Sequence, residues 1–300
     1  MYDLIIVGAG PAGITAGVYA ARKKINTVIL SKDIGGQAAL SGDIDNYTGY
    51  QFITGVELAQ KFEEHLTKFD IKLNYPEGVN GLEREGDLIK VNTEKGSYTA
   101  RAAIVASGRR TRGLNIPGEK EFKNRGLTYC ATCDAPFFGD KSVAVIGGGN
   151  AALDAALQLV RIAKKIYIVA LKPALEGDEI MLEEVRSNPK VEVITGADTK
   201  EIFGEKMVKG LKYEREGKAE RLDVEGVFIE IGSVPNSDFV KDVKLNDAGE
   251  IIVDKFNRTN IPGVFAAGDV TDVPEKQIIV AAGEGSKALL GVSKYLLTGK

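Results

Sequence analysis

The apolar positions near the N-terminus fall into two short runs separated by a turn and a helical segment. Leu4–Val7 is a continuous apolar run and Thr27–Leu30 is a second β-forming run, with a glycine-rich turn and an alanine-rich segment through Ala21 between them. Continuous runs of this length predict strands buried on both faces of a parallel sheet, and the alanine-rich segment predicts the connecting helix. The start of the chain therefore predicts a strand–turn–helix–strand unit.

The same order of elements returns in the middle of the chain. Ser142–Ile146 and Ile166–Val169 predict strands, and Leu153–Val160 predicts the start of the helix between them. Because 300 residues are too many for one ordinary hydrophobic core, we expect about two domains. The predicted fold class is α/β, with two Rossmann-like three-layer domains.

Both turns carry the Gly-x-Gly-x-x-Gly pattern of dinucleotide-binding domains, the second with alanine in the third glycine's place. The glycines permit a tight turn and a close approach of the backbone to a pyrophosphate, which lies on N–H groups at the start of the helix. Two such turns, each between a predicted strand and a predicted helix, are much stronger evidence of dinucleotide binding than one. A second copy of the unit that has lost its ligand remains an alternative. The residues concerned are Gly8, Gly10, Pro11, Ala12 and Gly13, and Gly147, Gly149, Asn150 and Ala151.

Charge and apolar run length argue against two classes of function. The chain has 39 basic and 42 acidic side chains, a net charge of −3, which does not favour a nucleic-acid or membrane surface. Its longest apolar runs are far too short to span a bilayer. Because the first predicted strand follows Met1-Tyr2-Asp3 directly, we expect no signal peptide and a cytoplasmic protein.

The chain has two cysteines, Cys130 and Cys133, and one histidine, His65. In a reducing compartment a Cys-x-x-Cys pair is more often catalytic, redox-sensing or metal-binding than structural, and its spacing permits a small reducible disulfide ring. Tetrahedral zinc would need two more ligands from a chain with no other cysteine, so we expect no metal. A chemically inert pair is the other alternative. His65 lies in an amphipathic segment and is expected at the surface.

Further motifs make a family recognisable. They are Gly35-Gly36-Gln37, Ile44–Tyr47, Ile104–Gly108, Cys130–Asp134, Val264–Val270 and Lys276–Ile278. With the two glycine turns they are colinear with motifs of the low-molecular-weight thioredoxin reductases (thioredoxin-disulfide reductases) and of the reductase portion of bacterial alkyl hydroperoxide reductases, which the chain resembles from about Tyr2 to Leu297. The resemblance implies an FAD-binding domain at residues 1–112 and 244–300, into which an NAD(P)H-type domain, residues 113–243, is inserted together with the redox disulfide.

The resemblance also implies the FAD contacts. Asp269 would accept hydrogen bonds from the ribityl hydroxyls, with a turn-capping role as the alternative, and residues 276–278 would bring donors to the flavin's pyrimidine edge. The acidic residue usual at the end of the second strand is absent, since Leu30-Ser31-Lys32 stands there and Asp33 follows a little further on. The expected FAD residues are Gly8, Gly10, Pro11, Ala12, Gly13, Gly35, Gly36, Gln37, Asn46, Ala106, Gly108, Gly268, Asp269, Lys276, Gln277 and Ile278.

The same resemblance assigns roles at the disulfide. Cys133 would receive electrons from the flavin, Cys130 would attack the disulfide of a partner, and Asp134 would be the general acid. Asp134 can serve near neutral pH only if burial raises its pKa; a helix or turn cap is the alternative reading. The family exposes its disulfide by rotating the inserted domain, and the links near Arg112-Gly113 and Asp242–Lys244 are the expected hinges.

The electron donor is where the chain departs most from the family. Members that use NADPH carry an arginine cluster after the second strand of the inserted domain, and NADH-using relatives carry a glutamate at the position of Ala170. This chain has Val169-Ala170-Leu171-Lys172-Pro173, in which only Lys172 is basic. NADH or NADPH with weak discrimination, a ferredoxin-like donor, or a site rebuilt around Lys172 all stay open, with a nicotinamide nucleotide favoured.

Acceptor and assembly follow from the resemblance as well. It implies a homodimer that reduces a thioredoxin- or glutaredoxin-like protein, and the start of the chain at its first strand leads us to expect a separate acceptor. The cysteine pair argues against the related ferredoxin–NADP reductases, which lack it. A flavoprotein redox sensor is the non-enzymatic alternative.

Overall fold

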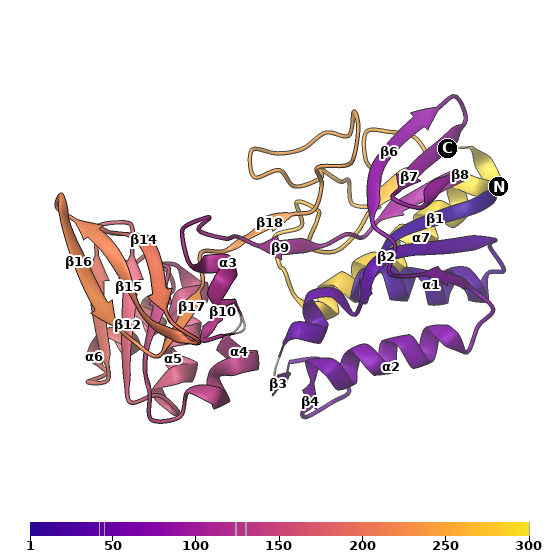
Figure 1. Ribbon diagram of the computed structural model, residues 1–300. Coiled ribbons are helices and arrows are strands. Elements are labelled where there is room, and N and C mark those ends of the chain that lie inside the picture. The colour runs from indigo at the N-terminus through magenta and orange to yellow at the C-terminus, as the bar shows by residue number, and fades with distance from the viewer. Residues whose placement is uncertain (42, 45, 124, 130, 300) are drawn as a thin grey trace. The chain divides into compact units, whose positions relative to one another are not determined.

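The computed structural model describes residues 1–41, 43–44, 46–123, 125–129 and 131–299, with the backbone alone for Asp43, Thr132 and Cys133. The chain forms two compact units. Unit 1 combines Met1–Arg110 with Val234–Lys300, and unit 2 is Thr111–Ser233 (Figure 1). This confirms the predicted fold class, in which the second Rossmann-like unit is inserted into the first.

Unit 1 is built on a seven-stranded sheet in the order β5-β2-β1-β8-β7-β6, with β19 paired to β8 as well. The β5, β2, β1, β8 and β19 pairings are parallel, whereas β6, β7 and β8 form an antiparallel meander. The central strands are buried on both faces, as their continuous apolar runs predict. The strands are β1 (Tyr2–Ala9), β2 (Thr27–Ile34), β5 (Lys72–Asn74), β6 (Val79–Glu85), β7 (Leu88–Thr93), β8 (Gly96–Val105) and β19 (Val264–Ala266).

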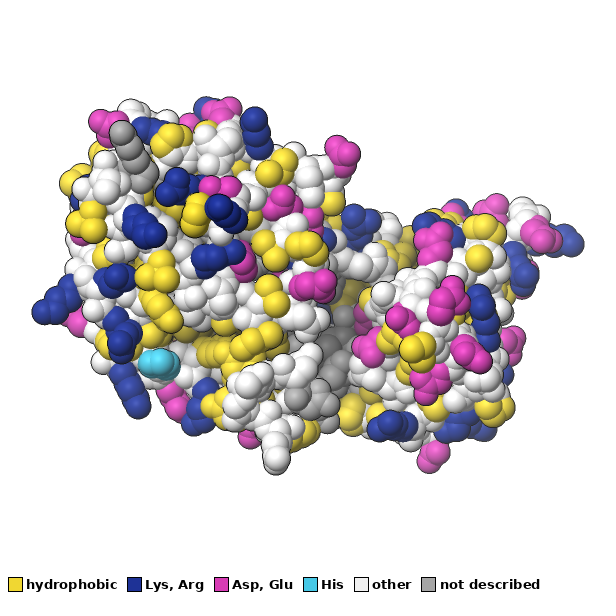
Figure 2. All heavy atoms as spheres, turned by 180° about the vertical axis from the view of Figure 1, so that it is seen from behind, with side chains coloured by type: hydrophobic (Ala, Val, Ile, Leu, Met, Phe, Trp, Pro, Cys, Tyr) yellow, Lys and Arg dark blue, Asp and Glu magenta, His cyan; other side chains and the backbone are white. Residues whose placement is uncertain are grey.

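Helices α1 (Pro11–Arg22) and α7 (Ile278–Thr298) pack closely on each other beside this sheet. A Cβ at Gly285 would lie 2.0 Å from the Ala12 carbonyl oxygen, so only glycine permits this approach. A capping box between Thr54 and Glu57 begins α2 (Gly55–Thr67). His65 lies on the exposed side of α2, as predicted (Figure 2, cyan). The remaining short elements are η1 (Gly36–Leu40), β3 (Asp43–Ile44) and β4 (Ile53–Thr54).

Unit 2 has three layers. Alternate residues of its parallel sheet, in the order β10-β17-β11-β12-β13, pack against α5 and α6 on one face and against an antiparallel sheet on the other. The parallel strands are β10 (Leu127–Thr128), β11 (Ser142–Ile146), β12 (Lys165–Ala170), β13 (Val191–Thr195) and β17 (Gly226–Ile229). The antiparallel strands are β14 (Ala197–Gly204), β15 (Val208–Arg215) and β16 (Lys218–Asp223). The helices are α3 (Glu119–Phe122), α4 (Ala131–Asp134), η2 (Ala135–Phe138), α5 (Asn150–Val160) and α6 (Glu179–Ser187).

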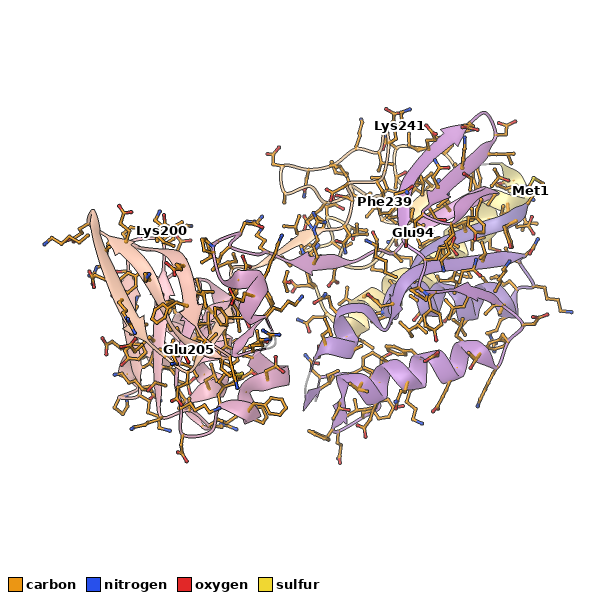
Figure 3. All side chains as sticks on the ribbon, viewed as in Figure 1. Met1, Glu94, Lys200, Glu205, Phe239 and Lys241 are labelled. Atoms are coloured by element: carbon orange, nitrogen blue, oxygen red, sulfur yellow. The ribbon has the colours of Figure 1, made fainter. Side chains whose placement is uncertain are left out.

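The chain crosses between the units in β9 (Arg109–Thr111) and β18 (Ser233–Pro235), which pair with each other. The return to unit 1 thus begins at Val234 and not at residue 244, and Asp242–Lys244 is not the second link. The reason is that the segment after β18 is bonded to β6: Leu82 N–H donates to the Phe239 carbonyl at 2.9 Å, and Lys241 N–H donates to the Leu82 carbonyl at 3.0 Å. Figure 3 shows the labelled Phe239 and Lys241 beside these strands.

Two observations concern the molecule as a whole. No helix within the described residues combines the length and the apolar character needed to cross a bilayer. Basic and acidic side chains are interspersed over the face drawn in Figure 2.

Candidate functional site

The first glycine turn joins β1 to α1 and is shaped by close backbone contacts. Gly8 has φ +106°, and a Cβ there would lie 2.3 Å from the Ala106 carbonyl oxygen. A Cβ at Gly13 would lie 1.9 Å from the Gly8 carbonyl oxygen. Both positions therefore require glycine for the fold itself.

Gly10 in the same turn is different. It is the N-cap of α1 with an ordinary extended backbone, φ −80° and ψ −173°. Beyond its chain neighbours, a Cβ at Gly10 would meet nothing closer than the Gly35 carbonyl oxygen, 3.9 Å away. No side chain caps the helix and no acid lies in its first turn, so the N–H groups of Ala12 and Gly13 have no helical acceptor and are available to an anion.

A cavity of about 760 Å³ opens in front of this turn, within unit 1. It brings together twelve of the sixteen predicted FAD residues from four separate parts of the sequence. These are Gly8, Gly10, Pro11, Ala12, Gly36, Gln37, Ala106, Gly108, Gly268, Asp269, Lys276 and Ile278. Their role in FAD binding stays a prediction, and the cavity supports it by its position at the carboxyl ends of parallel strands.

The other four predicted residues lie beside the cavity wall. Gly13 lies under the turn, and Gly35, with φ +85°, is packed so that a Cβ would lie 2.5 Å from the Cβ of Ala59. The Asn46 amide donates to the Gln277 side-chain oxygen at 3.2 Å, which links two segments that are far apart in the sequence.

Several cavity residues were missed from the sequence. At the end of β2, the Ser31 hydroxyl accepts from Ala9 N–H at 3.0 Å and donates to the Asp33 carbonyl at 2.6 Å, so Asp33 reaches the cavity wall. The buried Glu77 carboxylate accepts from the hydroxyls of Thr93 at 2.7 Å and Tyr98 at 2.9 Å. Glu77 belongs to no short motif, so only the tertiary structure identifies it, whereas Ser31 and Asp33 lie where the acidic residue of the first motif is usual. Other lining residues outside the predicted set include Lys32, Val79, Asn80, Ser107, Arg109, Arg110, Asn236, Asp238 and Phe239.

A cluster of charges lies at the Asp269 end of the cavity. Burial raises the pKa of Asp269, while the positive charges of Lys276 and Arg109 oppose that shift. Glu250 holds both cations, with its carboxylate 2.6 Å from the Arg109 guanidinium and 3.0 Å from the Lys276 ammonium. Lys276 also donates to the Thr271 carbonyl at 2.5 Å. The predicted flavin contact Lys276 is thus fixed by a carboxylate that no sequence motif marks.

Replacing Glu250 with glutamine should lower the free energy of unfolding of unit 1 by roughly 1–3 kcal/mol, because two partly buried cations lose their counter-charge. Burial alone would raise the pKa of Glu250, but hydrogen bonds from Asn246, Lys276 and Arg109 bring it below its ordinary 4.5. A carboxyl group whose pKa is lowered by folding stabilises the fold at pH values above its ordinary pKa. This contribution is lost as the pH falls through the folded-state pKa. The free energy of unfolding, measured in urea at pH 7 and at pH 4, should therefore differ less between the two pH values in the variant than in the wild type.

The matched control is Glu64→Gln. Glu64 is paired with Lys61 at 3.0 Å, but both side chains are more than half exposed. An exposed pair contributes less than about 0.5 kcal/mol, so this variant should unfold like the wild type. Equal unfolding of the Glu250→Gln protein and its control would show that the cluster is not a stabilising network.

The redox motif belongs to unit 2. Cys130 lies outside the described residues, and of Cys133 only the backbone, within α4, is described. The Asp134 carboxylate accepts a hydrogen bond from the Thr128 hydroxyl. Its role as general acid stays a prediction. The neighbouring Tyr129 hydroxyl donates to the buried Glu119 at 2.7 Å, and burial raises the pKa of Tyr129.

The second glycine turn repeats the geometry of the first. Gly147 has φ +146°, and a Cβ there would lie 2.2 Å from the Glu230 carbonyl oxygen. Gly149 caps α5 in an extended conformation, φ −106° and ψ −173°, with nothing closer to its Cβ position than the Glu176 carbonyl oxygen at 3.8 Å. The turn therefore keeps an open helix N-terminus as well as its packing role.

The segment after β12 folds back onto this turn. Glu176 N–H donates to the Gly148 carbonyl at 2.7 Å, and the Asn150 side chain accepts from Asp178 N–H at 2.8 Å. The Lys172 ammonium is 2.5 Å from the Glu176 carboxylate, and both side chains are mostly exposed. The one basic residue predicted to meet a 2′-phosphate is thus paired with an acid of its own loop. Ala151 lies on the first turn of α5.

Two Rossmann-like units in one chain, each with a glycine turn at the carboxyl ends of its parallel strands, define a class of two-domain α/β proteins of the dinucleotide-binding type. Within that class, the chain belongs to the pyridine nucleotide-disulphide oxidoreductase family, which it matches over residues 2–285. The thioredoxin-reductase branch of this family binds FAD. The open space at the Gly10 Cβ position and the available N–H groups of Ala12 and Gly13 fit the pyrophosphate of that cofactor.

Three similar proteins agree with the resemblance. The thioredoxin reductase of Lactococcus lactis superposes with a TM-score of 0.85 and 37% identity, covering 99% of both chains. The "NADH dehydrogenase" of Bacillus subtilis is 41% identical over 99% of this chain and 59% of its own length. A subunit of the alkyl hydroperoxide reductase of Pseudomonas putida is 42% identical over 99% of this chain and 58% of its own length. The chain therefore spans less than two thirds of these two curated relatives.

Proposed function

We propose that the chain is a flavin-dependent thioredoxin-disulfide reductase. Electrons pass from NADH or NADPH through FAD to the Cys130–Cys133 disulfide, and on to the disulfide of a thioredoxin- or glutaredoxin-like protein. The observation that carries the proposal is a Cys-x-x-Cys pair on an inserted unit with its own open glycine turn, in a chain whose other unit has a cavity that gathers the FAD motifs. End-to-end similarity to a thioredoxin reductase supports it.

The residues of each unit have separate tasks in this proposal. Bound FAD would supply reversible two-electron transfer between a nicotinamide and a disulfide. In unit 1, the N-terminus of α1 binds the pyrophosphate, Asp269 accepts hydrogen bonds from the ribityl chain, and Lys276 donates at the pyrimidine edge. In unit 2, the N-terminus of α5 binds the nicotinamide nucleotide, and Asp134 moves the proton at the leaving thiolate. β9 and β18 are the proposed hinges for a rotation that exposes the cysteine pair.

The donor is tested by mixing the purified holoprotein anaerobically with each nucleotide and following the loss of flavin absorbance. We expect NADH and NADPH to differ by less than about tenfold in rate constant, because Lys172 is paired with Glu176 and adds little at a 2′-phosphate. A ferredoxin donor is not favoured, since a relative at 41% identity is named for NADH. If neither nucleotide bleached the flavin rapidly, the proposal of a nicotinamide donor would be contradicted.

Turnover tests the acceptor side. Addition of a thioredoxin and insulin to the holoprotein with its nucleotide should produce many reducing equivalents per flavin. A redox sensor would transfer at most one equivalent per site and then stop, so the ratio separates the two alternatives.

A cytoplasmic homodimer is part of the proposal, supported by the family resemblance. Sedimentation equilibrium of the holoprotein should give twice the chain mass of 32.1 kDa. A monomer at all concentrations would contradict this.

A further inference from the structure

Glu230 lies where strand β17 of the unit 2 parallel sheet ends. It follows β17 directly, and β17 is flanked by β10 on one side and by β11 on the other. The carboxyl ends of adjacent parallel strands are where α/β sheets place their ligands and reacting groups. A carboxylate at this edge occupies a functional position, although no motif in the sequence marks it.

Two contacts connect Glu230 to the two chemical features of this unit. Its backbone lies against the second glycine turn: its N–H donates to the Ile146 carbonyl at 2.8 Å, and its carbonyl oxygen takes the space of a Gly147 Cβ. Its side chain reaches the redox motif, where Oε1 accepts from Ala131 N–H at 3.3 Å. Ala131 follows Cys130 in the chain, so the carboxylate is bonded to the peptide group that joins these two residues.

The charges around Glu230 do not neutralise it. Asp154 on α5 is the charged side chain that acts on Glu230, and it is also an acid. The other acid of α4, Asp134, is bonded to Thr128 of β10. Ile146 and the turn at Gly147–Gly149 carry no charge, and no lysine or arginine among the described residues forms an ion pair with Glu230. Burial raises its pKa, the hydrogen bond from Ala131 opposes the shift, and Asp154 adds to it, giving about 7.

We propose that Glu230 is a second proton-holding residue of the redox motif, besides Asp134, whose charge opposes thiolate formation at the Cys130–Cys133 pair. The inference rests on the proposed disulfide chemistry. The Glu230 carboxylate is hydrogen-bonded to the peptide N–H that follows Cys130, so a thiolate of the pair would be a like charge close to it, and the two groups would titrate as a coupled pair. Glu230 acts on the sulfurs through its charge and is a positioning residue.

In the reductive step, two electrons from the reduced flavin break the S–S bond and, with one proton, leave one thiol and one thiolate. Glu230 takes up a further proton from solvent as the thiolate forms, so the site gains no second negative charge. When the pair is oxidised by the partner's disulfide, the S–S bond forms again, the partner gains the two electrons, and Glu230 releases its proton.

The test is the alkylation of the dithiothreitol-reduced holoprotein by iodoacetamide as a function of pH, because only the thiolate reacts. Glu230→Gln keeps an acceptor for Ala131 N–H and removes the charge. We expect alkylation at pH 7.5 to be about three- to tenfold faster than in the wild type, which corresponds to a fall of roughly half to one unit in the thiol pKa. Glu230→Asp retains the charge and should restore a profile near that of the wild type.

Glu225→Gln is the matched control. Glu225 precedes the other end of β17 and is exposed, and its carboxylate accepts from Ser142 N–H at 3.4 Å, so the same charge is removed far from the motif. This variant should alkylate like the wild type. Equal pH profiles for Glu230→Gln and the wild type would overturn the inference. Alkylation unchanged by dithiothreitol would instead show that no disulfide forms, which overturns the proposed function itself.

A second measurement needs no variant. The reduced-minus-oxidised infrared difference spectrum of the wild-type holoprotein at pH 7.5 should contain the band of a newly protonated carboxyl group. A spectrum without that band would overturn the proton uptake even if Glu230→Gln did not fold.

Discussion

Replacing Cys133 with serine should lower disulfide turnover by at least about a thousandfold, because a hydroxyl can neither form a disulfide nor accept electrons from the flavin. FAD should remain bound at the wild-type stoichiometry, since every residue that lines the cavity belongs to unit 1. Bleaching of the flavin by the nicotinamide nucleotide should persist, because that step precedes the disulfide. The measurements are flavin content, anaerobic bleaching and thioredoxin-dependent insulin reduction on one preparation.

The control for this variant is Thr132→Ser, which changes the same segment and keeps both cysteines. It should retain turnover within about twofold of the wild type, since a conservative change of this kind usually has a small effect. Full disulfide turnover by the Cys133→Ser protein would show that the electrons follow another route, and the proposed function would be wrong.

Replacing Gly10 with valine should weaken FAD binding by at least about a hundredfold without unfolding the protein. The backbone of Gly10 suits any residue, and a Cβ would meet no described atom closer than 3.9 Å beyond the chain neighbours. The added methyl groups would occupy the space in front of the α1 N-terminus, where the pyrophosphate is expected, and would remove several charge-assisted hydrogen bonds. Flavin retained after dialysis, and the dissociation constant of added FAD, measure the effect.

Gly149→Val is the matched control because Gly149 has nearly the same backbone conformation at the start of α5, with its nearest neighbour 3.8 Å away. The Gly149→Val protein should keep its FAD, but its flavin should be bleached more slowly by the nicotinamide nucleotide. Unchanged bleaching would mean that the second turn is retained for packing alone.

Gly8→Ala should instead disturb the fold, since its Cβ would overlap the Ala106 carbonyl and its φ of +106° disfavours any side chain. Wild-type FAD affinity in the Gly10→Val protein would place the pyrophosphate elsewhere.

Local sequence patterns determined the parts of this protein that depend on neighbouring residues. The apolar runs predicted β1, β2, β11 and β12, because a strand buried on both faces must be continuously apolar. The glycine turns predicted a helix after each turn, but α1 and α5 begin within the motifs, at Pro11 and Asn150, and not after Gly13 and Ala152. The fold class and the family followed from the order of these motifs along the chain.

Only the tertiary structure decided which charges act at the sites. Glu77, Glu250 and Glu230 come from strand ends or loops outside every motif, and each is bonded to a partner that is distant in the sequence, as Glu250 is to Arg109. The boundary at Val234 was missed for the same reason: the segment to residue 243 is held in unit 1 by bonds to Leu82. The distinction between Gly8, needed by the fold, and Gly10, open to a ligand, also depends on which atoms the folded chain brings near them. Sequence patterns report contacts within a few residues, whereas burial and charge pairing depend on contacts between segments that only folding brings together.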